Sequence, residues 1–357
     1  MEIKSNAPAR ICLFGDHQDY LNLPVIACAI NRFIKIKAKP NNSKIFKIFK
    51  TDLNEIDQIS INDSLKIVKK EDYFRLALKV VKKYGCNPTK GYDLHISSDI
   101  PIKAGLSSSS SLVIAWIQFL VSTFKIDLKI SPLIIAKLAY EAEVIEQGSS
   151  GGKMDQYTIC NGNMIYLDPS DDNIQILKNP INTLIVGDSG ESKDTLGMLA
   201  FLKKKSWESI NKVKSRFPEF NIKKVDLKDL NLYYDLLGGN LSPFFEAAVM
   251  NYKITQKALN ELSKNKIPNK KYIGRLITEH HLLLKNNLKI TTEKIDSMIE
   301  SSIESGAYGA KIIGSGGGGC IVALADKNNA SKIITKMKNA GAKDAFEVEI
   351  SKGPSIS

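Results

Sequence analysis

The spacing of apolar and polar residues predicts alternating strands and helices along the whole chain. Residues 3–14 and 25–39 are long apolar stretches rich in β-branched side chains, which favours strands. Apolar residues at helical spacing over 73–84 predict a helix that ends near a glycine. Further helices are expected at 112–124, 132–147, 192–216, 243–263, 270–286 and 292–305, hairpins within 40–64, and further strands at 92–97, 164–168, 183–188, 320–325 and within 340–350.

Both halves of the chain therefore mix strands and helices, which predicts two α+β domains. The length of 357 residues exceeds what one ordinary core supports and suits two domains of typical size. The polar, turn-rich stretch at 169–182 is the best candidate for a boundary. We expect an N-terminal domain over 1–175 and a C-terminal domain over 176–357.

The composition favours a cytoplasmic protein with no nucleic-acid or membrane partner. The net charge is +12, but the lysines are scattered rather than gathered into a run with aromatic residues. Five widely spaced cysteines without a CxxC pair predict neither a zinc site nor a disulfide framework. No apolar run approaches the roughly 20 residues that span a bilayer, and the first ten residues lack the apolar stretch of a signal peptide.

The segment Pro101–Ser111 has the composition of a phosphate-binding loop. Gly105 lets a ligand approach the backbone, and five consecutive serines follow it at the start of a predicted helix. The N–H groups and the positive dipole end of a helix N-terminus attract phosphate, and a hydroxyl can ligate Mg²⁺. The segment is not a GxxxxGK[ST] loop, because no lysine follows the glycine. The alternative is a serine-rich helix cap without a ligand.

A strand carrying Arg10 leads into a polar turn with Asp16, His17 and Asp19. Two carboxylates and an imidazole within a few residues of each other suit a polyhydroxylated ligand. The alternative is an ordinary polar turn after an edge strand.

Two glycine-rich segments complete the set of motifs. Asp155 follows a Gly/Ser loop, where a carboxylate could act as a base in a cleft; the alternative is a solvated surface loop. Residues 314–319 include four consecutive glycines before a strand, a composition that is costly in backbone entropy. Such a run favours the close approach of a ligand or another backbone, with a plain turn as the alternative.

In this order and spacing, the four segments resemble the GHMP kinase superfamily, which includes galactokinase, homoserine kinase, mevalonate kinase and phosphomevalonate kinase. The resemblance extends from Ala7 to Leu324. It implies a two-domain α+β fold, with an N-terminal domain like that of a ribosomal protein and elongation factor G and a ferredoxin-like C-terminal domain. It also implies ATP as the phosphate donor, Mg²⁺ as the cofactor and a small-molecule acceptor, in a monomer or homodimer.

The resemblance implies a role for each matching residue. Asp155 would be the catalytic base, with Arg10 facing it and the transferred phosphate. The metal ligands would be Ser109 and Glu143. The acceptor would be bound by Asp16, His17, Asp19 and Gly152. ATP would be bound by Lys103, Gly105, Leu106, Ser107, Ser108, Ser109, Ser110, Gly316 and Gly317.

The motifs resemble two subfamilies with different acceptors. His-x-Asp-Tyr and Met-Asp-Gln are similar to galactokinase, whereas Leu-Phe-Gly-Asp-His and the Gly-Gly-Gly-Gly-Cys run are similar to mevalonate kinase. Mevalonate carries a carboxylate and has little use for the acidic pair Asp16 and Asp19, so we favour a sugar kinase acting on the anomeric 1-OH of galactose or a related sugar. Asp16 replaces a glutamate of galactokinase, which could signal a different sugar.

Two alternatives to a sugar kinase remain. The first is mevalonate kinase. The second is a non-catalytic sugar sensor, against which the presence of Arg10, Glu143 and Asp155 counts.

Overall fold

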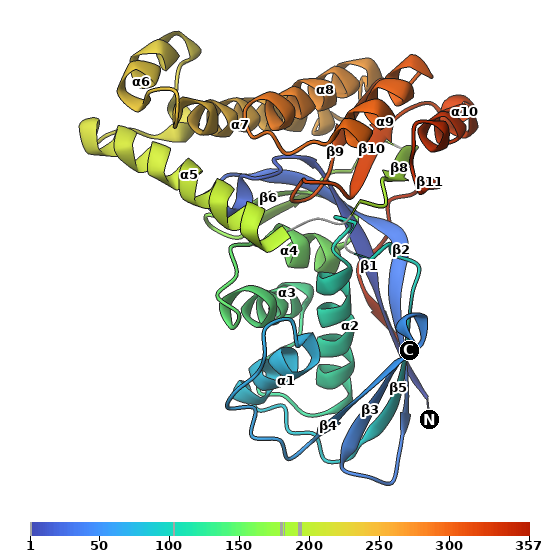
Figure 1. The fold of residues 1–357 in the computed structure, drawn as a ribbon. Helices are drawn as coiled ribbons and strands as arrows, with labels where there is room; N and C mark the ends of the chain where they lie inside the picture. Colours follow the sequence, from blue (N-terminus) through green and yellow to red (C-terminus); the bar gives the residue numbers. More distant parts are fainter. Residues whose placement is uncertain (1, 103, 179–180, 182, 192–194) are drawn as a thin grey trace.

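The computed structural model describes residues 2–102, 104–178, 181, 183–191 and 195–357, and its strands form two separate sheets (Figure 1). Over the described residues the first sheet has eight strands in the order β12-β1-β2-β5-β3-β4, and β6 pairs with β2 while β7 pairs with β6. Its strands are β1 (Ile3–Phe14), β2 (Val25–Pro40), β3 (Ile45–Lys50), β4 (Glu55–Ser60), β5 (Tyr92–Ser98), β6 (Met164–Asp168), β7 (Asn173–Ile176) and β12 (Ser355–Ile356).

The second sheet is antiparallel, and its described strands lie in the order β11-β8-β10-β9. Numbered along the chain, these strands lie in the order fourth, first, third, second, with helices after the first and the third, which is the ferredoxin-like arrangement. The strands are β8 (Leu184–Asp188), β9 (Gly309–Ile312), β10 (Cys320–Leu324) and β11 (Asp344–Val348).

Helices cover both sheets. In Figure 1, α1 to α4 pack on one face of the first sheet, while α5 to α10 belong to the half that contains the second sheet. The helices are α1 (Tyr73–Lys83), α2 (Ser108–Thr123), α3 (Pro132–Tyr140), α4 (Met154–Asn161), α5 (Thr195–Arg216), α6 (Leu230–Leu237), α7 (Ser242–Leu262), α8 (Lys270–Asn286), α9 (Glu293–Glu304) and α10 (Lys327–Asn339).

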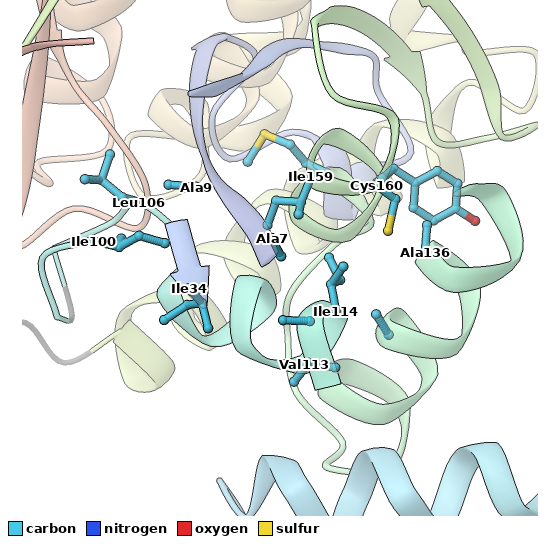
Figure 2. Close-up of a cluster of buried hydrophobic side chains, with 14 of the residues drawn as sticks. Ala7, Ala9, Ile34, Ile100, Leu106, Val113, Ile114, Ala136, Ile159 and Cys160 are labelled. Carbon is cyan, nitrogen blue, oxygen red and sulfur yellow. The ribbon is translucent and has the colours of Figure 1, made fainter. Parts of the chain in front are cut away.

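The largest apolar core lies between the first sheet and helices α1 to α4. Small residues on β1 let α2 and α4 approach the strand closely, and Figure 2 shows this part of the core. Burying such surface is worth about 25 cal/mol per Å², so this core stabilises the strand that carries Arg10. The labelled side chains are Ala7, Ala9, Ile34, Ile100, Leu106, Val113, Ile114, Ala136, Ile159 and Cys160.

The structure corrects the predicted helices near Asp155 and the serine run in three places. The helix expected at 112–124 begins at Ser108, so four serines form its first turn. The helix expected at 132–147 is interrupted, because α3 ends at Tyr140 and a π-helical turn, Glu141–Ile145, follows it. Helix α4 was not predicted, and it places Asp155 in a helical first turn rather than in a loop.

Over the described residues, no helix combines the length and the apolar character that a bilayer crossing requires.

Candidate active site

Arg10 and Asp155 form a bidentate ion pair at the centre of the site. Arg10 lies on β1, and its Nε and Nη2 donate to Asp155 Oδ1 and Oδ2 at 2.7 and 2.8 Å. The Arg10 side chain is 6% exposed and that of Asp155 is 28% exposed. The planar guanidinium therefore holds the carboxylate from the protein side, while the carboxylate keeps access to open space.

The phosphate loop closes against this pair. Gly105 O accepts a hydrogen bond from Arg10 Nη1 at 2.6 Å, and the Ser107 hydroxyl donates to Asp155. Gly105 and Ser107 have left-handed backbone conformations, with φ of 86° and 60°, and α2 begins at the next residue. The N-terminus of α2 thus starts beside Asp155, where its amides are available to a phosphate. Lys103, predicted to bind ATP, lies outside the described residues.

Glu143 lies against the serines of α2. It belongs to the π-helical turn, an irregularity frequent at functional sites. Its carboxylate accepts hydrogen bonds from the Ser109 and Ser110 hydroxyls and from Gln156 Nε2, the last at 2.6 Å. Burial raises the pKa of the Glu143 carboxyl, and the charge of Asp155 adds to the rise, although the hydrogen bonds oppose it.

The Ser109 hydroxyl and the Glu143 carboxylate are hard oxygen ligands of the type that Mg²⁺ prefers. Over the described residues, no group of three His, Cys, Asp or Glu side chains could hold a metal ion. Mg²⁺ commonly takes one or two carboxylates from a protein and completes its shell with phosphate oxygens and water. The pair therefore fits a magnesium ion that binds together with ATP phosphates.

Asp19 reaches into the same space from the loop after β1. Its Oδ1 accepts from Tyr20 N at 2.9 Å and its Oδ2 from Met154 N at 3.2 Å. A Cβ added at Gly152 would lie 2.1 Å from Asp19 Oδ2, so the absence of a side chain there permits the contact. Burial raises the pKa of Asp19 to about 6, and the neighbouring charge of Asp155 contributes to the rise.

His17 and Asp16 occupy different positions in the loop. His17 has a left-handed backbone, with φ of 62°, and its Nδ1 lies 3.2 Å from the Tyr20 hydroxyl. Asp16 is 1% exposed, and both of its carboxylate oxygens bond to the protein: Lys311 Nζ lies 2.5 Å from Oδ2, and Gly314 N donates to Oδ1 at 3.0 Å. No role was predicted for Lys311 from the sequence, where it is noticeable only as a charged residue within a short apolar run.

All eight residues with predicted roles in catalysis and in acceptor or metal binding line one cavity of about 200 Å³. Tyr73 and Gln156 also line it, although no sequence signal singled them out. The predicted residues in the lining are Arg10, Asp16, His17, Asp19, Ser109, Glu143, Gly152 and Asp155.

The glycine cluster at 314–319 contributes Gly314 and Ser315 to the cavity lining, and the glycines that follow pack against other parts of the backbone. Gly316 and Gly317 are not part of the lining: a Cβ on Gly316 would lie 2.4 Å from Ile290 Cβ, and Gly317 N donates to Ile290 O at 2.7 Å. At the end of the cluster, Cys320 N donates to Ala104 O at 2.8 Å, one residue before Gly105 of the phosphate loop. The glycines therefore permit close backbone packing next to that loop.

Comparison with known families identifies both halves of the chain. The family model described as GHMP kinases N terminal domain matches residues 69–163, and the model described as GHMP kinases C terminal matches residues 255–343. The chain belongs to the GHMP kinase superfamily. Residues 3–40 of this GHMP kinase also match a model described as the galactokinase galactose-binding signature.

Relatives of this GHMP kinase come from two subfamilies. It is 28% identical to mevalonate kinase of Thermococcus sibiricus over 350 residues, 96% of this chain and 94% of the relative. It is 26% identical to galactokinase of Actinobacillus succinogenes over 368 residues, 96% and 91% of the two chains. The crystal structure of Lactococcus lactis galactokinase complexed with galactose matches with a TM-score of 0.88 and 21% identity, covering 99% of this chain and 95% of that one.

These comparisons confirm the predicted two-domain fold and the predicted class of activity. Galactokinases and mevalonate kinases are ATP-dependent phosphotransferases that act on hydroxyl groups, and this chain is a kinase of the same superfamily.

Proposed function

We propose that this GHMP kinase transfers the γ-phosphate of ATP to a sugar hydroxyl, the anomeric 1-OH of galactose or of a related sugar. The charge of the cavity carries this proposal. Among the described lining residues Arg10 is the one permanently charged cation, and its guanidinium already holds Asp155. The acidic lining residues are Asp16, Asp19, Glu71, Glu143 and Asp155.

A neutral polyol suits this lining better than an anion does. Carboxylates accept hydrogen bonds from sugar hydroxyls, whereas the carboxylate of mevalonate would face several like charges, and among the described lining residues the one permanent cation, Arg10, is already paired with Asp155. The galactose-binding signature, which includes Asp16, His17 and Asp19, supports the same acceptor class.

In the proposed reaction Asp155 accepts the proton of the attacking hydroxyl, since its carboxylate is the partly exposed group at the centre of the cavity. Arg10 orients that carboxylate and adds positive charge beside the transferred phosphate. The amides at the start of α2 bind phosphate oxygens. Mg²⁺, which Ser109 and Glu143 would hold, neutralises charge on the ATP phosphates.

A second candidate is mevalonate kinase, because the relative from Thermococcus sibiricus is 28% identical along nearly the whole chain. Identity at that level does not separate the two acceptors. The distinction therefore depends on the electrostatics of the cavity, which an activity assay tests directly.

A panel of acceptors tests the proposed function. ADP release with Mg-ATP would be measured with galactose, arabinose, fucose, glucuronate, N-acetylhexosamines, mevalonate and homoserine. We expect turnover with at least one neutral sugar and little with mevalonate or glucuronate, because both acids carry a carboxylate. Turnover of mevalonate alone would overturn the sugar assignment, and tight sugar binding without turnover would indicate a sensor.

The affinity for the sugar is expected to fall as the pH drops below about 6, where Asp19 gains a proton. The protonated carboxyl loses capacity as an acceptor, so the KM for the sugar should rise on the acid side while the KM for ATP changes little. Measurement of both KM values from neutral to mildly acidic pH checks this.

The Asp19→Asn variant provides the comparison for this pH profile. It should have a raised KM for the sugar at every pH and no acid inflection attributable to residue 19. An unchanged KM in that variant would remove Asp19 from the acceptor site.

A further inference from the structure

A fully buried ion pair joins the loop after β1 to the second sheet. Lys311 lies on β9 and is 0% exposed, while Asp16 is 1% exposed. Lys311 Nζ lies 2.5 Å from Asp16 Oδ2 and donates to Cys12 O at 3.1 Å, and Gly314 N donates to Asp16 Oδ1 at 3.0 Å. Each charge in this contact has its partner, so the pair avoids the cost of an isolated buried charge.

The surroundings favour the ionised form of the Asp16 carboxyl. Burial raises the pKa of Asp16, but the charge and the hydrogen bond of Lys311 together with other nearby groups outweigh that effect, and the pKa is lowered overall. His280, on α8, is also buried here, and burial together with the charge of Lys311 lowers its pKa to about 3. The imidazole is therefore neutral at physiological pH, and its ring stacks on Phe14 at a centroid distance of 6.3 Å.

The pair connects the two loops that the reaction must align. On one side, Asp16 is followed directly by His17 and then by Asp19, which line the cavity. On the other side, Gly314 opens the glycine cluster, and the end of that cluster bonds to Ala104 beside the phosphate loop.

We infer that Asp16 and Lys311 form a positioning pair, which holds the loop after β1 in a fixed position relative to the phosphate loop. In this role Asp16 acts through Lys311 and Gly314 and does not itself recognise the acceptor. Asp16 is 1% exposed and bonds to the Lys311 ammonium, whereas Asp19 is 8% exposed and accepts from two backbone amides, which leaves His17 and Asp19 as the acceptor contacts of this loop. The inference rests on the proposed roles of these two loops.

Loss of the ion pair between Asp16 and Lys311 should lower the rate of phosphoryl transfer more than it lowers the affinity for ATP. Transferring a phosphoryl group requires the acceptor oxygen and the phosphorus to be aligned, and a displacement of about 1 Å can cost about 10²-fold in rate. In the proposed function ATP would contact the phosphate loop and not the loop after β1, so its affinity should change little.

The test is the double variant Asp16→Asn/Lys311→Met, which removes both charges and leaves neither one buried without a partner. We expect kcat to fall by about 10²-fold and the KM for the acceptor to rise, with the Kd for ATP nearly unchanged. The rate is referred to the concentration of ATP-binding sites, so partial unfolding lowers the number of sites and not kcat. A kcat per site equal to that of the wild type would overturn the inference.

Two further variants keep the test decisive. Lys338→Met/Asp344→Asn removes an exposed ion pair of 2.9 Å far from the cavity, and we expect it to leave kcat unchanged. Asp16→Glu keeps the charge but lengthens the side chain by one methylene, which should displace the loop and lower kcat. If the double variant forms no ATP-binding sites, the kcat per site of Asp16→Glu decides the question.

Failure of the proposed function would be recognised separately. The acceptor panel is measured on the wild type, and the variants are then compared using whichever acceptor the wild type phosphorylates. Hydrogen exchange over residues 104–111 gives a measurement that needs no acceptor: it should be faster in the double variant at an unchanged melting midpoint. Unchanged exchange there would count against the inference even if no acceptor were found.

Discussion

Asp155→Asn is expected to lower kcat for phosphorylation by about 10³-fold while leaving the affinity for ATP nearly unchanged. The amide keeps the shape of the side chain but cannot accept the proton of the attacking hydroxyl. Steady-state rates, calorimetric titration with ATP and a thermal melt measure the three quantities involved. The melt is needed because Asp155 also neutralises the buried Arg10 guanidinium.

Asp235→Asn is a matched control for this variant, since Asp235 is exposed on α6 and outside the cavity lining. It makes the same chemical change, and we expect its kcat to equal that of the wild type. Survival of the rate in Asp155→Asn, with ATP binding intact, would show that another group accepts the proton.

Arg10→Lys is expected to lower kcat by about 10²-fold, even though it preserves the charge. An ammonium is a compact charge without a planar fork, so it cannot bond both oxygens of Asp155 and Gly105 O in the observed geometry. The catalytic carboxylate and the phosphate loop would then lose their shared anchor. Rates and ATP affinity measured as for Asp155→Asn check this expectation.

Arg75→Lys is the corresponding control. Arg75 also makes a multidentate ion pair, with Asp57 and Asp72, but it lies outside the cavity lining. Its replacement should leave kcat unchanged.

The double variant of Arg10 and Asp155 should lose little more activity than Asp155→Asn alone, because the effects of substituting residues that act as a unit are not additive. Fully multiplicative losses would show that the two act independently.

Long elements with a clear period were predictable from the sequence. Long apolar stretches rich in β-branched residues predicted β1 and β2, and helical spacing predicted α7, α8 and α9 within about a residue at each end. The resemblance to GHMP kinases also marked Arg10, Ser109, Glu143 and Asp155, and the fold brings these four into one cavity although they are distant in sequence.

Helix α4 was missed because it has no polar face. Met154, Gln156, Tyr157 and Ile159 are all buried, so the segment lacks the amphipathic period that identifies a surface helix. The early start of α2 has a related cause. Serine competes with the backbone for hydrogen bonds and is a modest helix former, so packing of buried Ser110 and Ser111 rather than local preference extends the helix.

Lys311 could not be assigned from the sequence because its partner is 295 positions away. A single lysine in a short strand next to a glycine run has no periodic signature. Contacts of this kind depend on how the two sheets pack together, and no local pattern records that. The bonds of Asp16 to Lys311 and Gly314 were invisible for the same reason, although the residue itself was singled out.

The π-helical turn that carries Glu143 makes the site sensitive to chain length. A π-turn contains one residue more than the α-helical turn it replaces, and each residue turns a helix by about 100°. Loss of one residue between Tyr140 and Glu146 would restore a regular helix and rotate Glu143 away from the serines of α2. During divergence, this stretch should therefore tolerate changes of side chain more readily than insertions or deletions.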